Sequence, residues 1–143
     1  MTAKQWLMRA RNMEMRIEAL EEAKNRMYDR ATSITAKLSK APSSGGASHP
    51  GDKIAGYAVA SDLVEKQKAK LRHVQEEILQ LISEIEDNTI ATLLIEYYIN
   101  GKTWVQVSDK LGYSTSHVTK TLHPQALDEV TGILEAKGIL EKK

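Results

Sequence analysis

Two long stretches of the chain repeat apolar residues at steps of three and four. The first runs from about residue 3 to 40 and the second from about 54 to 86. This spacing predicts two long helices, each with one apolar seam along its length. The seam positions are Trp6, Ala10, Met13, Ile17, Leu20, Lys24, Met27, Ala31, Ile34 and Leu38 in the first stretch, and Tyr57, Ala60, Val64, Gln67, Leu71, Val74, Ile78, Leu81 and Ile85 in the second.

A segment rich in Pro, Gly and Ser, residues 41–53, separates the two stretches and predicts a flexible loop. Two helices joined in this way pack most simply as an antiparallel hairpin. Pairing Leu38 with Tyr57 in that hairpin would bring Lys24 close to Leu71. Further apolar residues beside the seam predict a partner for the hairpin, either a second copy or another protein. The alternative is a lone two-stranded coiled coil.

Short helical patterns follow from residue 88 onward. Residues 89–100 are apolar on most sides, which is typical of a central helix in a small bundle, and Gly101 follows as a stop signal. A last helix is expected over residues 126–136, after an interruption at Pro124. The predicted fold is therefore all-α, with an N-terminal hairpin domain over residues 1–87 and a second domain over 88–143.

Between these helices, residues 103–122 have the spacing of a helix-turn-helix. Trp104, Val107 and Leu111 fall on one face of a first helix. Thr103 and Gln106 form a capping-box pattern, and Gly112 is placed to end the helix in the left-handed conformation. Ser114 can cap a second helix, with Val118 and Leu122 facing inward and Ser108 small enough for a close helix crossing. The second helix of such a unit is built to lie in the DNA major groove.

Composition excludes several function classes. The chain has no cysteine, so disulfides and thiolate chemistry are ruled out. His117 and His123 are six residues apart, which is not the spacing of a helical metal pair, and no phosphate-loop or nucleophile-elbow pattern occurs. We expect no enzyme, no cofactor and no metal. Without a signal peptide or an apolar run of membrane length, the expected location is cytoplasmic, away from membranes.

Charge is unevenly distributed. Residues 1–53 carry ten Lys/Arg against six Asp/Glu, residues 54–87 four against seven, and residues 88–143 six against six. A DNA-binding domain usually has a basic face, so the neutral C-terminal part is a weak electrostatic footprint. Within residues 102–123 the balance is more favourable, with Lys102, Lys110 and Lys120 against Asp109 alone.

Several stretches support a family resemblance. They are M-T-A-K-Q-W-L-M-R-A-R at 1–11, the Gly/Ser/Pro loop at 41–51, I-S-E-I-E-D at 82–87, Y-I-N-G-K-T-W at 98–104, L-G-Y-S at 111–114 and H-P-Q-A-L at 123–127. The C-terminal part resembles the promoter-reading fourth region of sigma-70 type factors. The whole chain is similar to a family of small proteins encoded by phages and prophages of Gram-positive bacteria, whose relatives include phage late-gene transcription activators. The resemblance implies transcription control.

The chain departs from that family pattern in the length of one interval and in the residue type at several positions. The interval from Val118 to Leu127 is one residue longer, and Pro124 replaces a glycine. The family also often has Arg or Lys where this chain has Tyr97, Thr119 and Thr121, which lowers the expected number of phosphate contacts.

The candidate site is a recognition helix over about residues 115–122. Its hydroxyl side chains can donate or accept at base edges, and Lys120 can reach guanine or phosphate. The N–H groups of its first turn and the start of the preceding helix favour the phosphate backbone. The expected DNA-binding residues are Lys102, Thr103, Ser114, Thr115, Ser116, His117, Thr119 and Lys120.

Purely structural interpretations exist for the same residues. Ser114 can be a plain helix cap, and Lys120 a merely solvated lysine. Trp104 and Tyr113 resemble a stacking platform for single strands, although periodicity favours core positions for both. The leading hypothesis is a sigma-like, DNA-binding transcription regulator that binds duplex DNA. Host RNA polymerase and a second copy of the chain are further candidate partners. The alternative is a helical protein–protein adaptor, for oligomerisation or polymerase binding, whose helix-turn-helix does not read DNA.

Overall fold

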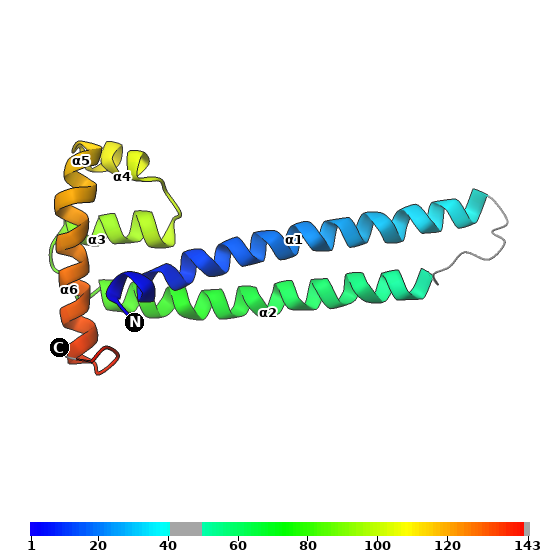
Figure 1. Cartoon of the computed structure of the whole chain (residues 1–143), viewed down its shortest axis with the longest axis horizontal. Helices are drawn as coiled ribbons and strands as arrows, with labels where there is room; N and C mark the ends of the chain where they lie inside the picture. The colour runs from blue at the N-terminus through cyan, green and yellow to red at the C-terminus, as the bar shows by residue number, and fades with distance from the viewer. Residues whose placement is uncertain (41–49, 142–143) are drawn as a thin grey trace. The chain divides into compact units, whose positions relative to one another are not determined.

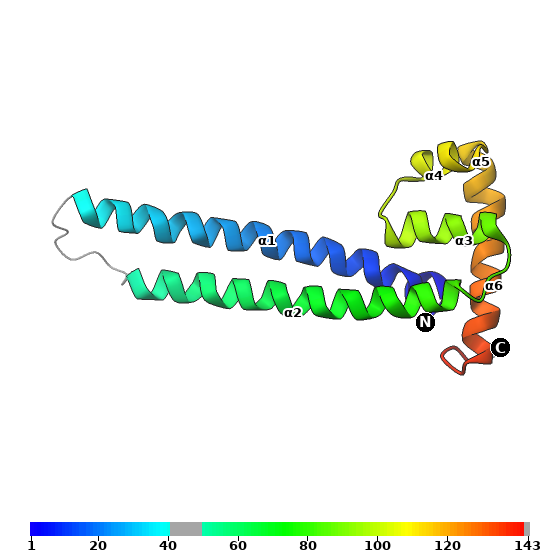
Figure 2. The ribbon, with the colours of Figure 1, turned by 180° about the vertical axis from the view of Figure 1, so that it is seen from behind.

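The structure is a computed structural model that describes residues 1–40 and 50–141, and the side chains of residues 1–32 and 54–141 among these. Helices α1 (Ala3–Lys40) and α2 (Pro50–Ile82) form a long antiparallel hairpin, which confirms the predicted fold class (Figures 1 and 2). A small bundle follows. Its elements are α3 (Asn88–Leu94), η1 (Ile95–Ile99), α4 (Trp104–Leu111), α5 (Thr115–His117), η2 (Val118–Leu122) and α6 (His123–Ala136), where η1 and η2 are π-helical turns.

The chain forms two compact units. Met1–Asn12 and Leu71–Lys143 make one, called the basal unit here, and Met13–Lys70 makes the other, called the hairpin unit. The predicted domain boundary between residues 87 and 88 lies within the basal unit, because the first turns of α1 and the last turns of α2 share a core with the short helices. That core includes Leu7, Ile78, Leu93 and Val130, all fully buried.

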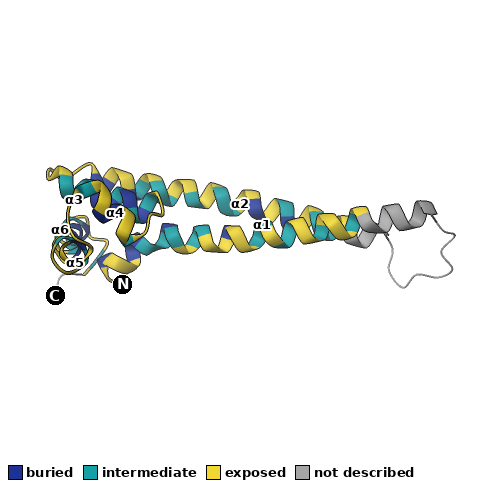
Figure 3. Ribbon diagram, turned by 90° about the horizontal axis from the view of Figure 1, so that it is seen from above, coloured by how far each residue is buried: buried dark blue, intermediate teal, exposed yellow. Residues whose placement is uncertain are grey.

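The predicted seams are confirmed along the described parts of both long helices. Trp6, Ala10 and Ile17 are buried on α1, and Figure 3 shows the buried positions recurring along one side of each helix. Lys24 is the polar interruption of the first seam, and it is half-buried. This is typical of a lysine whose aliphatic stem packs on apolar surface while its ammonium group reaches water. The seam residues Ile34 and Leu38 lie outside the described side chains.

The predicted helix pairing was wrong in its register. In the hairpin unit Tyr57 packs on Tyr28, with ring centroids 5.6 Å apart, and the Lys68 ammonium lies 3.0 Å from the Glu21 carboxylate. In the predicted pairing Tyr57 would face Leu38 and Lys68 would face Met27, so the observed partners on α1 lie about six to ten residues from the predicted ones. A seam of repeated three- and four-residue steps looks alike after such a slide, so the apolar pattern alone could not select the register.

The ends of α2 also differ from the prediction. The helix begins at Pro50 rather than near residue 54, and proline is favoured in the first turn, where its missing N–H has no partner to lose. Only residues 41–49 of the predicted loop lie outside the described part of the chain. At its other end α2 stops at Ile82, four residues before the predicted end. A turn follows, in which the Ser83 hydroxyl donates to the Gln80 carbonyl oxygen. Asp87 then caps α3 by accepting from the N–H groups of Thr89 and Ile90.

Among the described residues, none of the helices combines the length and the apolar character needed to span a membrane.

Candidate nucleic-acid interface

The start of α4 is fixed by the predicted capping box. The Thr103 hydroxyl accepts from the backbone N–H of Gln106 at 3.2 Å, and the Gln106 side-chain oxygen accepts from the N–H of Thr103 at 2.9 Å. Both bonds satisfy donors that the helix itself leaves open. The first helix of the motif therefore begins where the sequence predicts.

The turn between α4 and α5 has the predicted geometry. Gly112 ends α4 with φ of 79°, in the left-handed region that glycine enters without steric cost. Its N–H and that of Tyr113 both donate to the Ser108 carbonyl oxygen, at 2.9 and 3.2 Å. Ser114 then opens α5, and its hydroxyl accepts from the N–H of His117 at 3.1 Å. The two helices are thus joined by three residues in a helix-turn-helix arrangement.

The contact between the two helices is small and closely packed. Val107 and Val118 are fully buried, and Ser108 is 2% exposed. The Ser108 hydroxyl donates to the Trp104 carbonyl oxygen at 2.7 Å, so its burial leaves no polar atom unpaired. The prediction of a small residue at this crossing is confirmed.

The recognition helix does not end at Pro124, which corrects the predicted interruption. Helix α5, the turn η2 and α6 follow one another without a break, so residues 115–136 form one helical segment. Within η2 the N–H of His123 donates to the Val118 carbonyl oxygen, five residues back. This wider turn comes just before Pro124, whose ring would otherwise meet the carbonyl of residue 120. At the end of the π turn Leu122 packs against the core, and the next residue, His123, is buried in it.

The first turns of α1 hold the start of the motif in place. The Arg11 guanidinium donates to the backbone oxygens of Tyr97, at 3.1 Å, and Lys102, at 3.4 Å, and lies 4.2 Å above the Tyr97 ring. The Tyr97 ring in turn stacks on Trp104, with centroids 3.7 Å apart and planes 10° from parallel. Since Tyr97 covers the Trp104 indole and the ring packs against the core, Trp104 is not an open stacking platform for bases.

A buried polar pair lies behind this stack. The Tyr98 hydroxyl and Nε2 of His123 share a hydrogen bond of 2.6 Å. Tyr98 is fully buried and His123 is 8% exposed. Burial raises the pKa of Tyr98, and burial together with the nearby Lys4 lowers the pKa of His123 to about 4. Both side chains are therefore neutral near pH 7, and His123 serves the core rather than a ligand.

Of the eight candidate residues, two lie at the start of α4 and six at and after the Ser114 cap, and all but Thr119 are exposed. Thr103 and Ser114 have their hydroxyls in caps. The half-buried Thr119 donates its hydroxyl to the Thr115 carbonyl oxygen at 3.0 Å, a bond within its own helix. The side chains placed to meet an external partner are Lys102, Thr115, Ser116, His117 and Lys120.

One lysine of the region is engaged internally. The Lys110 ammonium lies 2.8 Å from the carboxylate of Glu96, which is 7% exposed. The hydrogen bond from Lys110 lowers the pKa of Glu96 in spite of its burial. Lys110 therefore neutralises a buried charge. Lys102 and Lys120 are the lysines of residues 102–123 that remain available to an external partner.

The expected core position of Tyr113 was wrong. Its side chain is 48% exposed, and its ring lies 5.0 Å from the ring of His117. Its N–H completes the glycine turn, and this geometry leaves the side chain at the surface. Tyr113 and His117 form an exposed aromatic pair at the entry to the recognition helix.

Sequence reasoning missed Arg11, Glu96 and His123 as supports of the motif. Arg11 lies between seam positions of the first helix, where a solvent-exposed side chain is expected, and its partners lie more than 80 residues further along the chain. Glu96 lies in an apolar helix pattern, which signals a buried charge that needs a partner, but no local spacing points to Lys110. Among the described residues, no group of three or more His, Asp or Glu side chains gathers to hold a metal ion.

These features define an all-helical protein with a capped helix-turn-helix on a basal core. Over residues 31–129 the chain matches the model of a family described as protein of unknown function (DUF1492), and it belongs to this family. We found no significant match among curated proteins and none among solved structures.

Proposed function

We propose that the protein is a DNA-binding transcription regulator whose recognition helix, from Thr115 to about Leu122, enters the major groove of duplex DNA. The observation that carries this proposal is the α4–turn–α5 geometry. A capping box, a left-handed Gly112 and a Ser114 cap hold the second helix rigidly, with its first turn turned to solvent. Helices held in this way present N-terminal side chains to base edges.

The chemistry of the exposed first turn agrees with this role. Thr115 and Ser116 offer hydroxyls that can donate or accept at base edges, and Lys120 lies about one turn further along. Lys120 has no ion pair with a described residue, so its charge is available. Lys102, exposed just before α4, is suited to a phosphate of the flanking backbone.

The binding is expected to be weak for the isolated chain. Phosphate neutralisation supplies most non-specific affinity, and the motif has only two exposed lysines once Lys110 is paired. A second copy of the chain, or attachment to host RNA polymerase, would raise the local concentration at the target. The sigma-like and phage-type resemblance of the sequence supports the same proposal. A dimer would predict a two-fold symmetric target, which light scattering can address.

The test measures the affinity for duplex DNA at several salt concentrations, with fluorescence anisotropy as the readout. Lys120→Ala should weaken binding and reduce the slope of log K against log salt by about one. Lys70→Ala is the matched control, because Lys70 is an exposed lysine on α2 in the hairpin unit. An unchanged slope in Lys120→Ala would remove this residue from the interface, and no binding of the parent chain with or without polymerase would overturn the proposal.

One observation favours the adaptor as a second candidate. Val105, in the first turn of α4, is 57% exposed, and Tyr113, in the turn after α4, is 48% exposed, so the motif presents two large apolar side chains to solvent. A protein partner would bury both. In that case Val105→Ser and Tyr113→Ser would abolish capture of the partner while leaving any weak duplex binding unaltered.

A further inference from the structure

A second surface of the basal unit has the character of a docking groove. It has a volume of about 690 Å³ and lies between α6 and the segment that joins α2 to α3. The recognition helix begins at the other end of the continuous segment 115–136, so this groove is separate from the proposed DNA face.

The floor of the groove is apolar and open. Ile85 and Ile133 are half-buried, pack against the core and line the groove. Between the walls Gly132 is exposed, and a Cβ added there would meet nothing within 4 Å. Gly132 lies inside α6 and has no positive φ, so neither internal packing nor backbone conformation requires glycine. A glycine inside a helix is destabilising relative to alanine, and such a position is explained when another backbone approaches closely.

The rim of the groove is acidic. Glu84, Glu86, Asp87, Asp128 and Glu129 line it, against Lys137 as the one cation among the lining residues. Lys137 is paired with Glu84 at 3.1 Å, and Asp87 caps α3. The remaining three carboxylates have no ion pair with a described residue. A negative rim around an apolar floor complements a segment with basic side chains on both sides of an apolar stripe.

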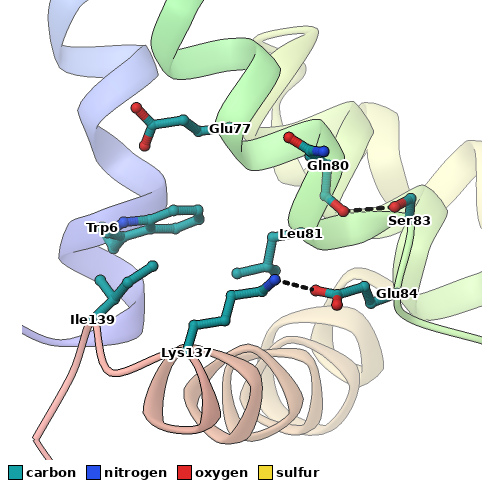
Figure 4. A pocket seen from close by; sticks show the side chains of 8 residues that line it. All are labelled: Trp6, Glu77, Gln80, Leu81, Ser83, Glu84, Lys137 and Ile139. Atoms are coloured by element: carbon teal, nitrogen blue, oxygen red, sulfur yellow. Dashed lines mark hydrogen bonds and ion pairs between the residues drawn. The ribbon is translucent and has the colours of Figure 1, made fainter.

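The Lys137–Glu84 ion pair marks one border of the groove. On its other side lies a second hollow of about 370 Å³, shown in Figure 4, with Trp6, Leu81 and Ile139 around it. There the carboxylate of Glu77 is already paired, with Arg9 at 3.3 Å and His73 at 3.1 Å. The hollow beside Trp6 is thus close to neutral, and the unbalanced negative charge belongs to the groove along α6.

We propose that the groove between α6 and residues 84–87 docks a basic amphipathic helix of a partner protein. The partner's apolar stripe would cover Ile85 and Ile133, and its backbone would approach α6 at Gly132. Its lysines and arginines would meet Glu86, Asp128 and Glu129. A helix fits because the lining residues follow α6 from Asp128 to Ala136, more than two turns along which i, i+3 and i+4 anchors can engage.

The probe is a synthetic peptide of about 18 residues, five helical turns, made of Leu, Ala and Lys with one apolar stripe. Two controls have the same length: one with every Lys replaced by Glu, and one with the same composition scrambled to remove the stripe. Binding to the full chain is measured by anisotropy at physiological salt, and its location by amide chemical shifts. The Lys peptide should bind, with shifts gathered at residues 84–87 and 128–137, and both controls should bind at least about tenfold more weakly.

Variants of the groove sharpen the test. Gly132→Leu fills the floor and should weaken binding about tenfold, while Gly132→Ala should raise the melting temperature and still weaken binding. Glu86→Gln with Asp128→Asn should weaken it as well; Asp87 is left intact because of its cap. The matched control is Glu65→Gln with Glu76→Gln, two exposed carboxylates on α2 that do not line the groove, and it should bind like the parent.

Three results would overturn the proposal. Equal binding of the scrambled peptide would show attraction by charge alone. Shifts spread along α2 rather than gathered at the groove would place the peptide elsewhere. Concentration-dependent shifts of the groove residues without peptide, lost in Gly132→Leu, would show that a second copy of the chain is the occupant.

Discussion

The Tyr98 hydroxyl lies 2.6 Å from Nε2 of His123, and together they join the two π turns in the core of the basal unit. Tyr98 belongs to η1, and His123 follows directly after η2. Each partner satisfies a polar atom that the other would otherwise leave buried and unpaired. The hydrogen bond thereby connects the central helix to the recognition helix at a point with little access to water.

The buried imidazole makes stability depend on pH. The pKa of His123 is about 4 in the folded chain, below its ordinary value of 6.5, so the unfolded chain binds more protons between these values. Stability is therefore fully present above about pH 6.5 and is lost as the pH falls toward 4, by at most about 1.4 kcal/mol per pH unit. Urea unfolding at several pH values should show this loss in the parent chain and a smaller loss in His123→Gln.

The comparison with His123→Gln removes the contribution of carboxylates, which titrate in both proteins. Parallel pH profiles for the two would contradict the assignment of the effect to His123. Tyr98→Phe is a further check, since it leaves Nε2 without its partner and should cost about 1–3 kcal/mol at pH 7.

The Lys110–Glu96 pair gives a second prediction. Lys110→Met leaves the buried Glu96 carboxylate without its cation. Lys110 is itself more than half exposed, so we expect a loss of about 1–2 kcal/mol, below the range for a fully buried pair. Denaturant unfolding of Lys110→Met and of the double variant with Glu96→Gln measures it, and the double variant should regain most of the loss because no buried charge remains.

The pH dependence of this pair has a defined sign. Lys110 lowers the pKa of Glu96, so its contribution to stability is present above the ordinary carboxyl pKa and is lost as the pH falls through the lower, folded value. That acid-dependent loss should be missing in Lys110→Met. If it persists unchanged, another carboxylate is responsible.

The π turn before Pro124 predicts an unusual tolerance of deletion. Removing the exposed Thr121 together with Pro124→Ala should convert η2 to a regular α-helical turn, because a π turn contains one residue more than the helix needs. The residues of α6 then keep their faces, and the chain should fold with a similar melting temperature.

The matched control is deletion of the exposed Asp128 within regular α6. That deletion rotates the preceding part of the helix against Val130 and Leu134, both fully buried, and should prevent cooperative folding. Circular dichroism during heating distinguishes the two variants. If both deletions prevent cooperative folding equally, η2 does not contain a residue in excess of a regular helical turn.

Local signals in the sequence were sufficient for the helices, the capping box, the Gly112 turn and the buried Val107 and Val118, because each of these depends on residues a few positions apart. The interactions that hold the motif in place were beyond such signals. Arg11 reaches Tyr97, and Tyr98 reaches His123, across 86 and 25 residues, and neither partner has a spacing that reveals the other. The predicted position of Tyr113 was wrong for a related reason. Tyr113 follows the glycine turn and lies outside both helices, so no helical periodicity indicates whether its side chain is buried.

The hairpin register is the clearest case of a long-range feature that the seams could not determine, and crosslinking between α1 and α2 can test it. The chain has no cysteine, so introduced pairs can be crosslinked without background. Glu21→Cys with Lys68→Cys should react intramolecularly with a short thiol crosslinker, because the parent side chains form an ion pair of 3.0 Å. Met27→Cys with Lys68→Cys is the control, because pairing Leu38 with Tyr57 would place Met27 opposite Lys68. Met27 is six residues from Glu21, which is about 9 Å along α1. This control pair should react slowly in dilute protein on a gel-shift assay. Faster reaction of the Met27 pair would show that α1 and α2 pair in the register read from the seams, and would reverse the assignment of Tyr28 and Tyr57 as neighbours.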